Sequence, residues 1–322
     1  MEALLTHSSL QTLLILLAVT AVDGIWRWPL SSHPLTLLRH LAEGMATKVR
    51  PSSQDGRTQH RISGALGAGV LIVPFVVLIA MLVYMAEYPV FFEAIIIASI
   101  IDFGHIRWRY QRVVAALGQQ KKLLARDMLS HIVARDCHAL SEIGIAKAAI
   151  ESLLLRFHYQ YCGVIIWFIL AGPVAALTYR MILLFAWQWH WRRPGFLYFV
   201  QPVRNLAKVA AFLPLCFSAF LLMLVTNPST AWRAAKRGPA KDATSVLLAL
   251  FGGGMGIRLG GPVMYHGSKY RYPRVGGQRE VRYSDLTYCQ RAITRATLLL
   301  IALASLLLLL VWFINRPYGS LL

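Results

Sequence analysis

The chain has 322 residues, 57% of them hydrophobic, and its 33 Lys and Arg against 14 Asp and Glu give a formal net charge of +19. This pairing of apolar content with a basic excess excludes both a soluble enzyme and a disordered basic tail. The sequence predicts one all-α, polytopic membrane domain over residues 1–322, with about five or six transmembrane helices and cytoplasmic helical loops.

Apolar stretches long enough to cross a bilayer recur along the chain. A helix needs about 20 apolar residues to span the hydrocarbon core, because no backbone polar group can stay unpaired in lipid. A shorter stretch that carries Glu93 is included as a further span. In chain order, the predicted spans are 9–25, 64–86, 89–104, 161–187, 206–225 and 296–314.

Lys and Arg gather in three of the segments between these spans, 26–62, 105–160 and 226–295. Because basic residues are enriched in cytoplasmic loops, all three are predicted to be cytoplasmic and the N-terminus to lie outside. The segments 105–160 and 226–295 are the two cytoplasmic excursions expected to form the site. The segment 26–62 is predicted to be a flexible connection.

One connection conflicts with six straight spans. Such spans place Arg192 and Arg193 outside, although basic residues favour the cytoplasmic side. A break at Gly172-Pro173 would let two half-helices re-enter and return on the same side, because proline interrupts a helix. The sequence leaves both topologies open.

Two polar regions carry the residues best suited to chemistry. Residues 121–158 show an apolar stripe at helical spacing, which predicts a helix against the membrane surface. Residues 251–265 place many glycines beside Arg258, and backbone N–H groups in such a run can approach an anion closely. Close helix packing is the competing explanation of these glycines, since no phosphate-loop or dinucleotide fingerprint is present.

Metal and nucleic-acid sites are not expected. The four cysteines and ten histidines show no metal-ligand spacing. The basic residues are spread over membrane loops and form no soluble module interleaved with aromatic residues. The sequence therefore predicts no protein-built metal centre and no nucleic-acid partner.

Several short motifs, in this order, resemble the CobD/CbiB family of membrane cobalamin biosynthesis proteins. The resemblance covers most of the chain, and the glycine-rich segment together with the one ending at Asp136 is fairly specific. The motifs are Asp23, His33-Pro34, Leu129–Asp136, Ala148–Glu151, Gly256–Pro262, Tyr265 and Tyr272–Gly276.

This resemblance implies an activity and a location. A protein similar to adenosylcobinamide-phosphate (cobinamide) synthase would join an aminopropanol unit to a cobyric acid carboxylate in an ATP-dependent amide ligation. The implied partners are a corrinoid substrate, ATP with Mg²⁺, membrane lipid and other membrane proteins. The implied location is a bacterial cytoplasmic (inner) membrane, which the chain would cross several times.

The resemblance also implies roles for particular residues. Asp136 and Glu151 would be catalytic, by binding Mg²⁺ or orienting the amine. Cationic and glycine-rich positions would hold phosphate or propionate groups. The residues assigned in this way to substrate binding are Arg135, Arg258, Gly260, Gly261 and His33.

The chain departs from the family where acidic and amide motifs are expected. Glu-Asn and Asp-Gly pairs are replaced by Leu155-Arg156 and Tyr159-Gln160, and a Ser-Pro-Asn-Ala-Gly segment by Lys241–Ser245. A lower number of oxygen ligands favours an alternative, a non-catalytic regulatory or sensor protein similar to the AmpE branch. A basic scaffold that attracts anionic lipid is the third hypothesis. Whether the chain is an enzyme is left open.

Overall fold

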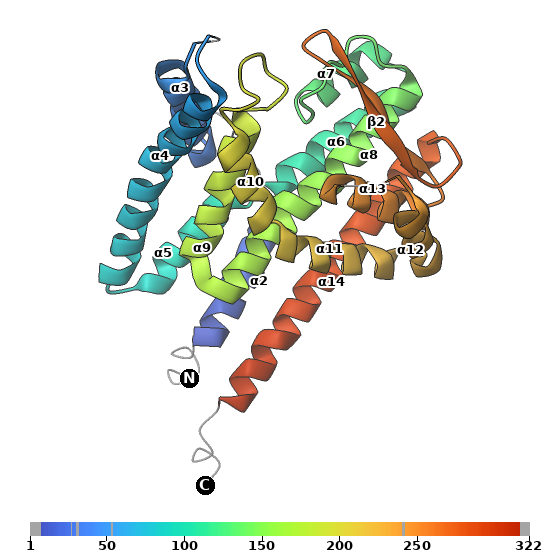
Figure 1. The fold of residues 1–322 in the computed structure, drawn as a ribbon. Helices are drawn as coiled ribbons and strands as arrows, with labels where there is room; N and C mark the ends of the chain where they lie inside the picture. Colours follow the sequence, from blue (N-terminus) through green and yellow to red (C-terminus); the bar gives the residue numbers. More distant parts are fainter. Residues whose placement is uncertain (1–7, 27, 30–31, 53, 240–241, 316–322) are drawn as a thin grey trace.

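The computed structural model describes residues 8–26, 28–29, 32–52, 54–239 and 242–315, which form a helical bundle with one antiparallel β-hairpin (Figure 1). The first helices are α2 (Ser8–Ile25), α3 (Pro34–Val49), α4 (Arg57–Met85), α5 (Pro89–Ile100), α6 (Phe103–Gly118) and α7 (Lys122–Ser130). The following elements are α8 (Glu142–Arg156), the π-helix η1 (Phe157–Cys162), α9 (Gly163–Gln188), α10 (Gln201–Ala210), α11 (Phe212–Val225), α12 (Pro228–Arg237), α13 (Ala243–Gly254), β1 (Arg258–Tyr265), β2 (Ser268–Gly276) and α14 (Tyr283–Ile314).

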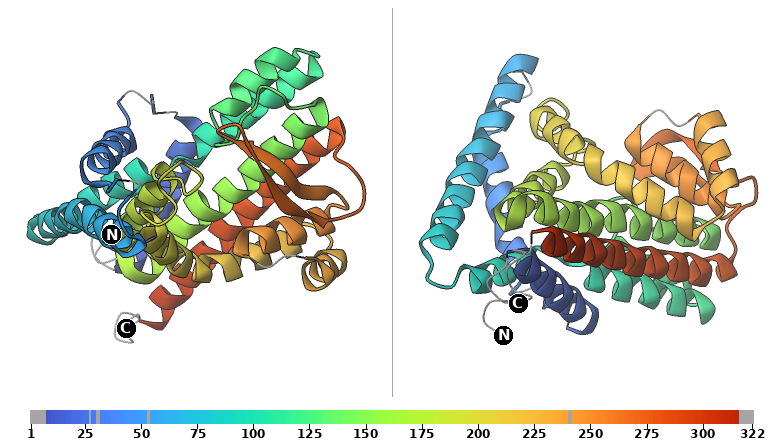
Figure 2. Two further views of the ribbon diagram at one scale, coloured as in Figure 1. Left: turned by 45° about the horizontal axis from the view of Figure 1, so that its top comes forward. Right: turned by 90° about the horizontal axis from the view of Figure 1, so that it is seen from below.

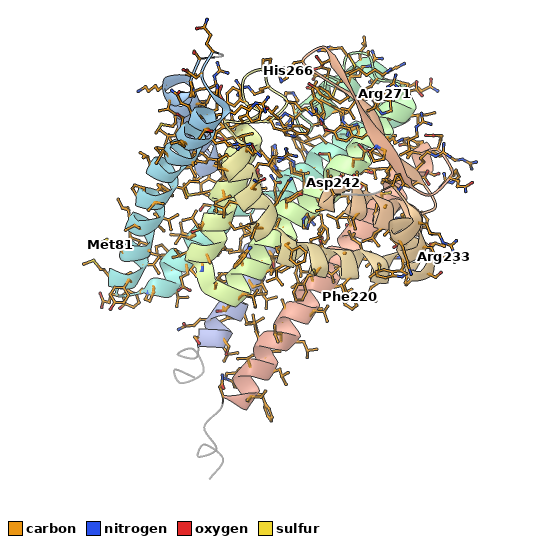
Figure 3. All side chains as sticks on the ribbon, in the orientation of Figure 1. Met81, Phe220, Arg233, Asp242, His266 and Arg271 are labelled. Atoms are coloured by element: carbon orange, nitrogen blue, oxygen red, sulfur yellow. The ribbon has the colours of Figure 1, made fainter. Side chains whose placement is uncertain are left out.

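Five helical segments among the described residues are long and apolar enough to cross a membrane, which confirms the predicted all-α polytopic class. Helices α4 and α14 expose many of their apolar side chains, as expected of surfaces that lipid covers. In Figure 3, Met81 of α4 and Phe220 of α11 lie low in the view, whereas His266 and Arg271 lie near the top, at the β-hairpin end of the molecule. This end is called the basic end. The five segments are Ser8–Ile25, Arg57–Met85, Pro89–Gly118, Glu142–Gln188 and Tyr283–Ile314.

The long segment from α8 to α9 is a hairpin of two arms. Ala171 (φ −140°) and Gly172 (φ 78°) leave the helical conformation just before Pro173. Figure 1 shows the chain, drawn in yellow-green, reversing its direction there. The second arm ends beside α3, where the Trp189 indole N–H donates to the Ala42 carbonyl over 2.8 Å. The start of α8 and the end of α9 therefore lie at the same end of the molecule.

The connection after α9 consequently lies at the basic end. Arg193 forms an ion pair of 2.8 Å with Glu43 of α3. Arg192 donates from Nη2 to the Tyr272 hydroxyl of β2 over 3.1 Å. Of the two topologies that the sequence leaves open, the structure therefore has the half-helices, and six straight spans are wrong.

The two arms of this hairpin approach closely at a glycine. A Cβ on Gly163 would lie 2.3 Å from the Tyr179 hydroxyl of the other arm. That hydroxyl donates to the carbonyl of Tyr159 in η1 over 3.0 Å. Local π-helix geometry is frequent at functional sites, and here it lies within the first arm, where that arm contacts the second.

The predicted span 206–225 is not one straight helix, because it covers the end of α10 and all of α11, which are bent by 50°. Pro214 has no backbone N–H, and its ring would clash with the carbonyl of Ala210 in a continuous helix. Helix α10 ends at Ala210, whose carbonyl instead accepts from the Trp167 indole N–H over 3.0 Å. The bend thus keeps α10 near the basic end.

Three smaller expectations also need correction. The supposedly flexible segment 26–62 contains α3, which begins with a proline and is capped by His33. The predicted span 89–104 is too short, because the candidate span runs over Pro89–Gly118 and contains the break between α5 and α6. The excursion 105–160 overlaps two candidate spans, so only 119–141 stands outside them, and the helix predicted over 121–158 breaks between α7 and α8.

Cysteine labelling in intact membranes tests this topology. In a Cys216→Ala background, which removes the exposed native thiol, single cysteines at positions 55 and 195 are expected to react from the same side. A cysteine at position 88 should react from the opposite side, because the α4–α5 connection lies at the other end of α4 (Figure 1). Labelling of positions 88 and 195 from one side would contradict the hairpin at Gly172.

Candidate functional site

The β-hairpin packs along α8 and α13 at the basic end, and Figure 2 (left) shows its orange strands beside the green α8. His266 (φ 48°) and Gly267 (φ 75°) form its two-residue turn, where positive φ at both positions matches the twist of the strands. The strand register shifts between Gly260 (φ 72°) and Pro262. Such a bulge redirects the backbone locally, and here it directs one N–H toward α8.

Glu151 of α8 is the centre of the site. Only 4% of the residue is exposed. One carboxylate oxygen, Oε1, accepts from the Gly260 N–H over 2.7 Å. The other, Oε2, forms an ion pair and hydrogen bond with Arg135 Nη2. Three motifs that are far apart in the sequence therefore meet at one buried carboxylate.

Arg135 lies in the irregular loop between α7 and α8. Burial lowers the pKa of this guanidinium, whereas the Glu151 carboxylate and, to a smaller extent, Tyr265 and Cys137 raise it, so the net pKa lies above the ordinary value. Arg135 is thus a permanent cation held in a buried position. Charge-assisted hydrogen bonds of this kind are stronger than those between neutral groups.

Asp136 lies at the other end of the hairpin. Its carboxylate Oδ2 accepts from the Gly267 N–H over 3.0 Å, and its own N–H donates to the Met264 carbonyl over 2.9 Å. Asp136 therefore holds the hairpin turn, while Arg135 and Glu151 hold the hairpin bulge.

Cations border the bulge. A Cβ on Gly261 would lie 3.9 Å from Lys147 Nζ and 3.8 Å from Arg274 Nε. Arg258, the first residue of β1, is partly exposed and lies 3.5 Å from Glu280. The charge of Lys147 interacts with those of Glu151, Glu280, Arg274 and Arg258. The arrangement can bind an anionic group next to Glu151.

His33 lies elsewhere. Its Nδ1 caps α3 by accepting from the Leu35 N–H over 3.1 Å. The ring borders a cavity of about 40 Å³ that Asp23 and Asp102 also line. Burial lowers the pKa of His33. Among the predicted site residues, His33 is thus the one that the structure does not bring to the hairpin.

A second buried polar cluster was not predicted. Arg180 of the α9 hairpin is 1% exposed and donates from Nε to the Ile100 carbonyl over 3.1 Å. With its amide oxygen turned toward the guanidinium groups, Gln160 accepts from Arg156 at 2.6 Å and from Arg180 at 3.2 Å. Two arginines in an apolar span are costly, so this pair marks a functional position by default.

Lys147 was also missed as a site residue, although its spacing contained a signal. It precedes Glu151 by one helical turn, so both side chains lie on one face of α8. The same spacing is typical of solvated helix surfaces, and only the hairpin packed against this face shows that the pair is partly enclosed.

Among the described side chains, no cluster would hold Mg²⁺ by protein ligands alone. Within the described ranges, no group of three or more His, Cys, Asp or Glu side chains could hold a metal ion. Asp136 and Glu151 already accept hydrogen bonds from backbone N–H groups.

The fold and site define a polytopic α-helical membrane protein in which a β-hairpin covers a buried Arg–Glu pair at the basic end. The profile described as CobD/Cbib protein matches residues 15–313, so the chain belongs to the CobD/CbiB family, and the resemblance seen in the sequence is confirmed.

Relatives from several bacteria carry the name Cobalamin biosynthesis protein CobD. The one from Chromobacterium violaceum is 23% identical over 283 residues, covering 86% of this chain and 89% of the relative. The one from Stutzerimonas stutzeri is 24% identical over 258 residues, with 79% and 84% covered. The one from Mycobacterium tuberculosis H37Rv is 25% identical over 301 residues, with 90% and 93% covered. No solved structure matches this chain significantly.

Proposed function

We propose that this protein acts in cobalamin biosynthesis, in a bacterial cytoplasmic membrane, and forms the amide between an aminopropanol unit and a corrinoid carboxylate. The family and the names of its relatives support the role in cobalamin biosynthesis and hence a corrinoid substrate. The observation that carries the amide-forming reaction is the meeting of Arg135, Glu151 and Gly260 beside a group of cations.

In this proposal, the cations bind the substrate, and the carboxylates hold the β-hairpin that carries some of these cations. Lys147, Arg258 and Arg274 hold the anionic groups of the substrate, because such groups pair strongly with ammonium and guanidinium donors. Glu151 fixes the bulge and Asp136 fixes the turn, so the hairpin presents these cations in one geometry. ATP would supply the phosphoryl group that activates the corrinoid carboxylate.

Complementation tests the proposal. A bacterium that lacks its own cobinamide synthase is expected to grow on cobyric acid when it expresses this chain, with cobinamide as the positive control. Arg258→Ala should abolish growth on cobyric acid, because it removes a cation beside the bulge. Arg233→Ala is the matched control, since this exposed arginine of α12 hydrogen-bonds only within its own helix. Growth on cobinamide alone, with the protein present in the membrane, would reject the ligase.

One observation favours a second candidate, a non-catalytic regulatory protein of the AmpE kind. Asp242, within the segment that replaces a family motif, caps α13 by accepting from Ser245. The carboxylates of Asp136 and Glu151 are likewise engaged by backbone N–H groups. A protein whose acidic groups all serve the fold would insert normally into the membrane and fail the complementation test.

A further inference from the structure

A cavity of about 280 Å³ lies between the connection after α9 and the tip of the β-hairpin. Neither the Arg135–Glu151 pair nor the cations at the bulge line it. The residues that define this tip pocket are Trp191, Arg192, Tyr265, His266, Ser268 and Tyr270. Aromatic walls and a guanidinium are thus contributed by two segments that only the reversal of α9 brings together.

The guanidinium of Arg192 lies over two rings of the tip pocket. Its guanidinium carbon lies 3.5 Å from the ring centroid of Trp191 and 3.6 Å from that of Tyr270. Nη2 donates to the Tyr272 hydroxyl, while Nε is buried and has no hydrogen-bond partner among the described residues. A guanidinium is a planar cation that pairs strongly with phosphate oxygens, and none of the ion pairs among the described residues includes Arg192.

Two of the cations around the tip pocket, Arg192 and Arg204, form no ion pair with the described carboxylates. A second guanidinium, that of Arg204, lies 4.2 Å from the Trp191 centroid. The ion pairs of the described residues include Arg193 with Glu43, but neither Arg192 nor Arg204. Burial, and then the charges of neighbouring cations, lower the pKa of His190 to about 4. The pocket therefore has a positive potential that favours an anion.

The tip pocket adjoins the Arg135–Glu151 pair through one residue. Tyr265 lines the pocket and packs against His190, with ring centroids 5.2 Å apart. Burial raises the pKa of the Tyr265 hydroxyl, and the charges of Arg135, Glu151 and Arg192 all act on it. Tyr265 thus couples the tip pocket electrostatically to the Arg135–Glu151 pair.

We propose that the tip pocket binds a phosphate group whose planar or apolar carrier packs against Trp191 and Tyr270. The assignment of this phosphate to a substrate of amide formation rests on the proposed function, whereas phosphate binding itself does not. Two sources share the chemistry, a soluble phosphate ester and the headgroup of an anionic lipid.

Titration of the full chain with inorganic pyrophosphate, in a neutral detergent, tests the proposal by calorimetry. Saturable binding is expected for the wild type. Ser268→Glu, at an exposed position of the pocket wall, should weaken it about tenfold or more, because it places a like charge beside the ligand. Ser268→Gln, which has the same shape without the charge, should stay within about twofold of the wild type.

A second pair of variants guards against misfolding of the hairpin tip. Leu197 lines the pocket from the connection after α9. Leu197→Glu should weaken pyrophosphate binding, and Leu197→Gln should not, as at Ser268. Absence of saturable binding, or equal affinities of the Glu and Gln variants at both positions, would overturn the proposal.

Nanodiscs then separate the two sources of phosphate. If phosphatidylglycerol in a phosphatidylcholine bilayer competes with pyrophosphate, the pocket takes a lipid headgroup. If the affinity is unchanged, the pocket takes a soluble phosphate ester. Binding is measured without turnover, so failure of the complementation test would leave this result interpretable.

Discussion

Replacing Glu151 by glutamine is expected to abolish growth on cobyric acid and to destabilise the folded protein by about 3–5 kcal/mol. The substitution leaves the buried Arg135 cation without its counter-charge and weakens the hydrogen bond from Gly260. Thermal unfolding in detergent measures the stability, and complementation measures the function. Glu142→Gln, at the exposed start of α8, is the matched control and should change neither.

A double variant separates the contribution of the Arg135–Glu151 pair to folding from its role in positioning the hairpin bulge. Arg135→Gln combined with Glu151→Gln removes both buried charges, so most of the lost stability should return, as is found when a buried pair is replaced as a unit. Growth should not return, because the ion pair that fixes the hairpin bulge is still missing. Recovery of growth by the double variant would show that the pair serves folding alone.

Gly260→Ala is expected to abolish growth on cobyric acid because the added methyl group cannot fit. The residue has φ 72°, and a Cβ there would lie 2.3 Å from the carbonyl oxygen of Pro273 on the paired strand. The bulge must therefore shift, and the Gly260 N–H can then no longer donate to the Glu151 carboxylate. The cost to stability should exceed the ~1 kcal/mol that a left-handed alanine costs by itself.

Gly267→Ala measures the cost of a left-handed alanine without a steric clash. Gly267 has φ 75°, nearly the same backbone conformation, but nothing lies within 4 Å of its Cβ position. The hydrogen bond that Gly267 donates to Asp136 comes from its backbone N–H, so alanine keeps it. This variant should lose about 1 kcal/mol in thermal unfolding and still support growth. Equal effects of the two substitutions would contradict a special role of the bulge at Gly260.

Much of the site could be predicted from motifs, but not its internal arrangement. Arg135, Glu151 and Gly260 were expected together, and they do meet. His33 was expected with them and instead caps α3 beside another cavity, because a motif records which residues recur and not which of them are neighbours. Arg192 stood out in the sequence only through the topology, and its place in a pocket could not be predicted, since its ring partner Tyr270 comes from a distant strand.

The sequence by itself determined the class of the protein, its family and the basic end on which the site lies. Lipid leaves backbone groups no partner outside the helix, so long apolar runs dictate helices. The tertiary structure decided the topology, because the reversal at Gly172 and the bend before Phe212 depend on which surfaces pack together. It also decided which motif residues are in contact, because Arg135, Glu151 and Gly260 meet only once the β-hairpin packs against α8.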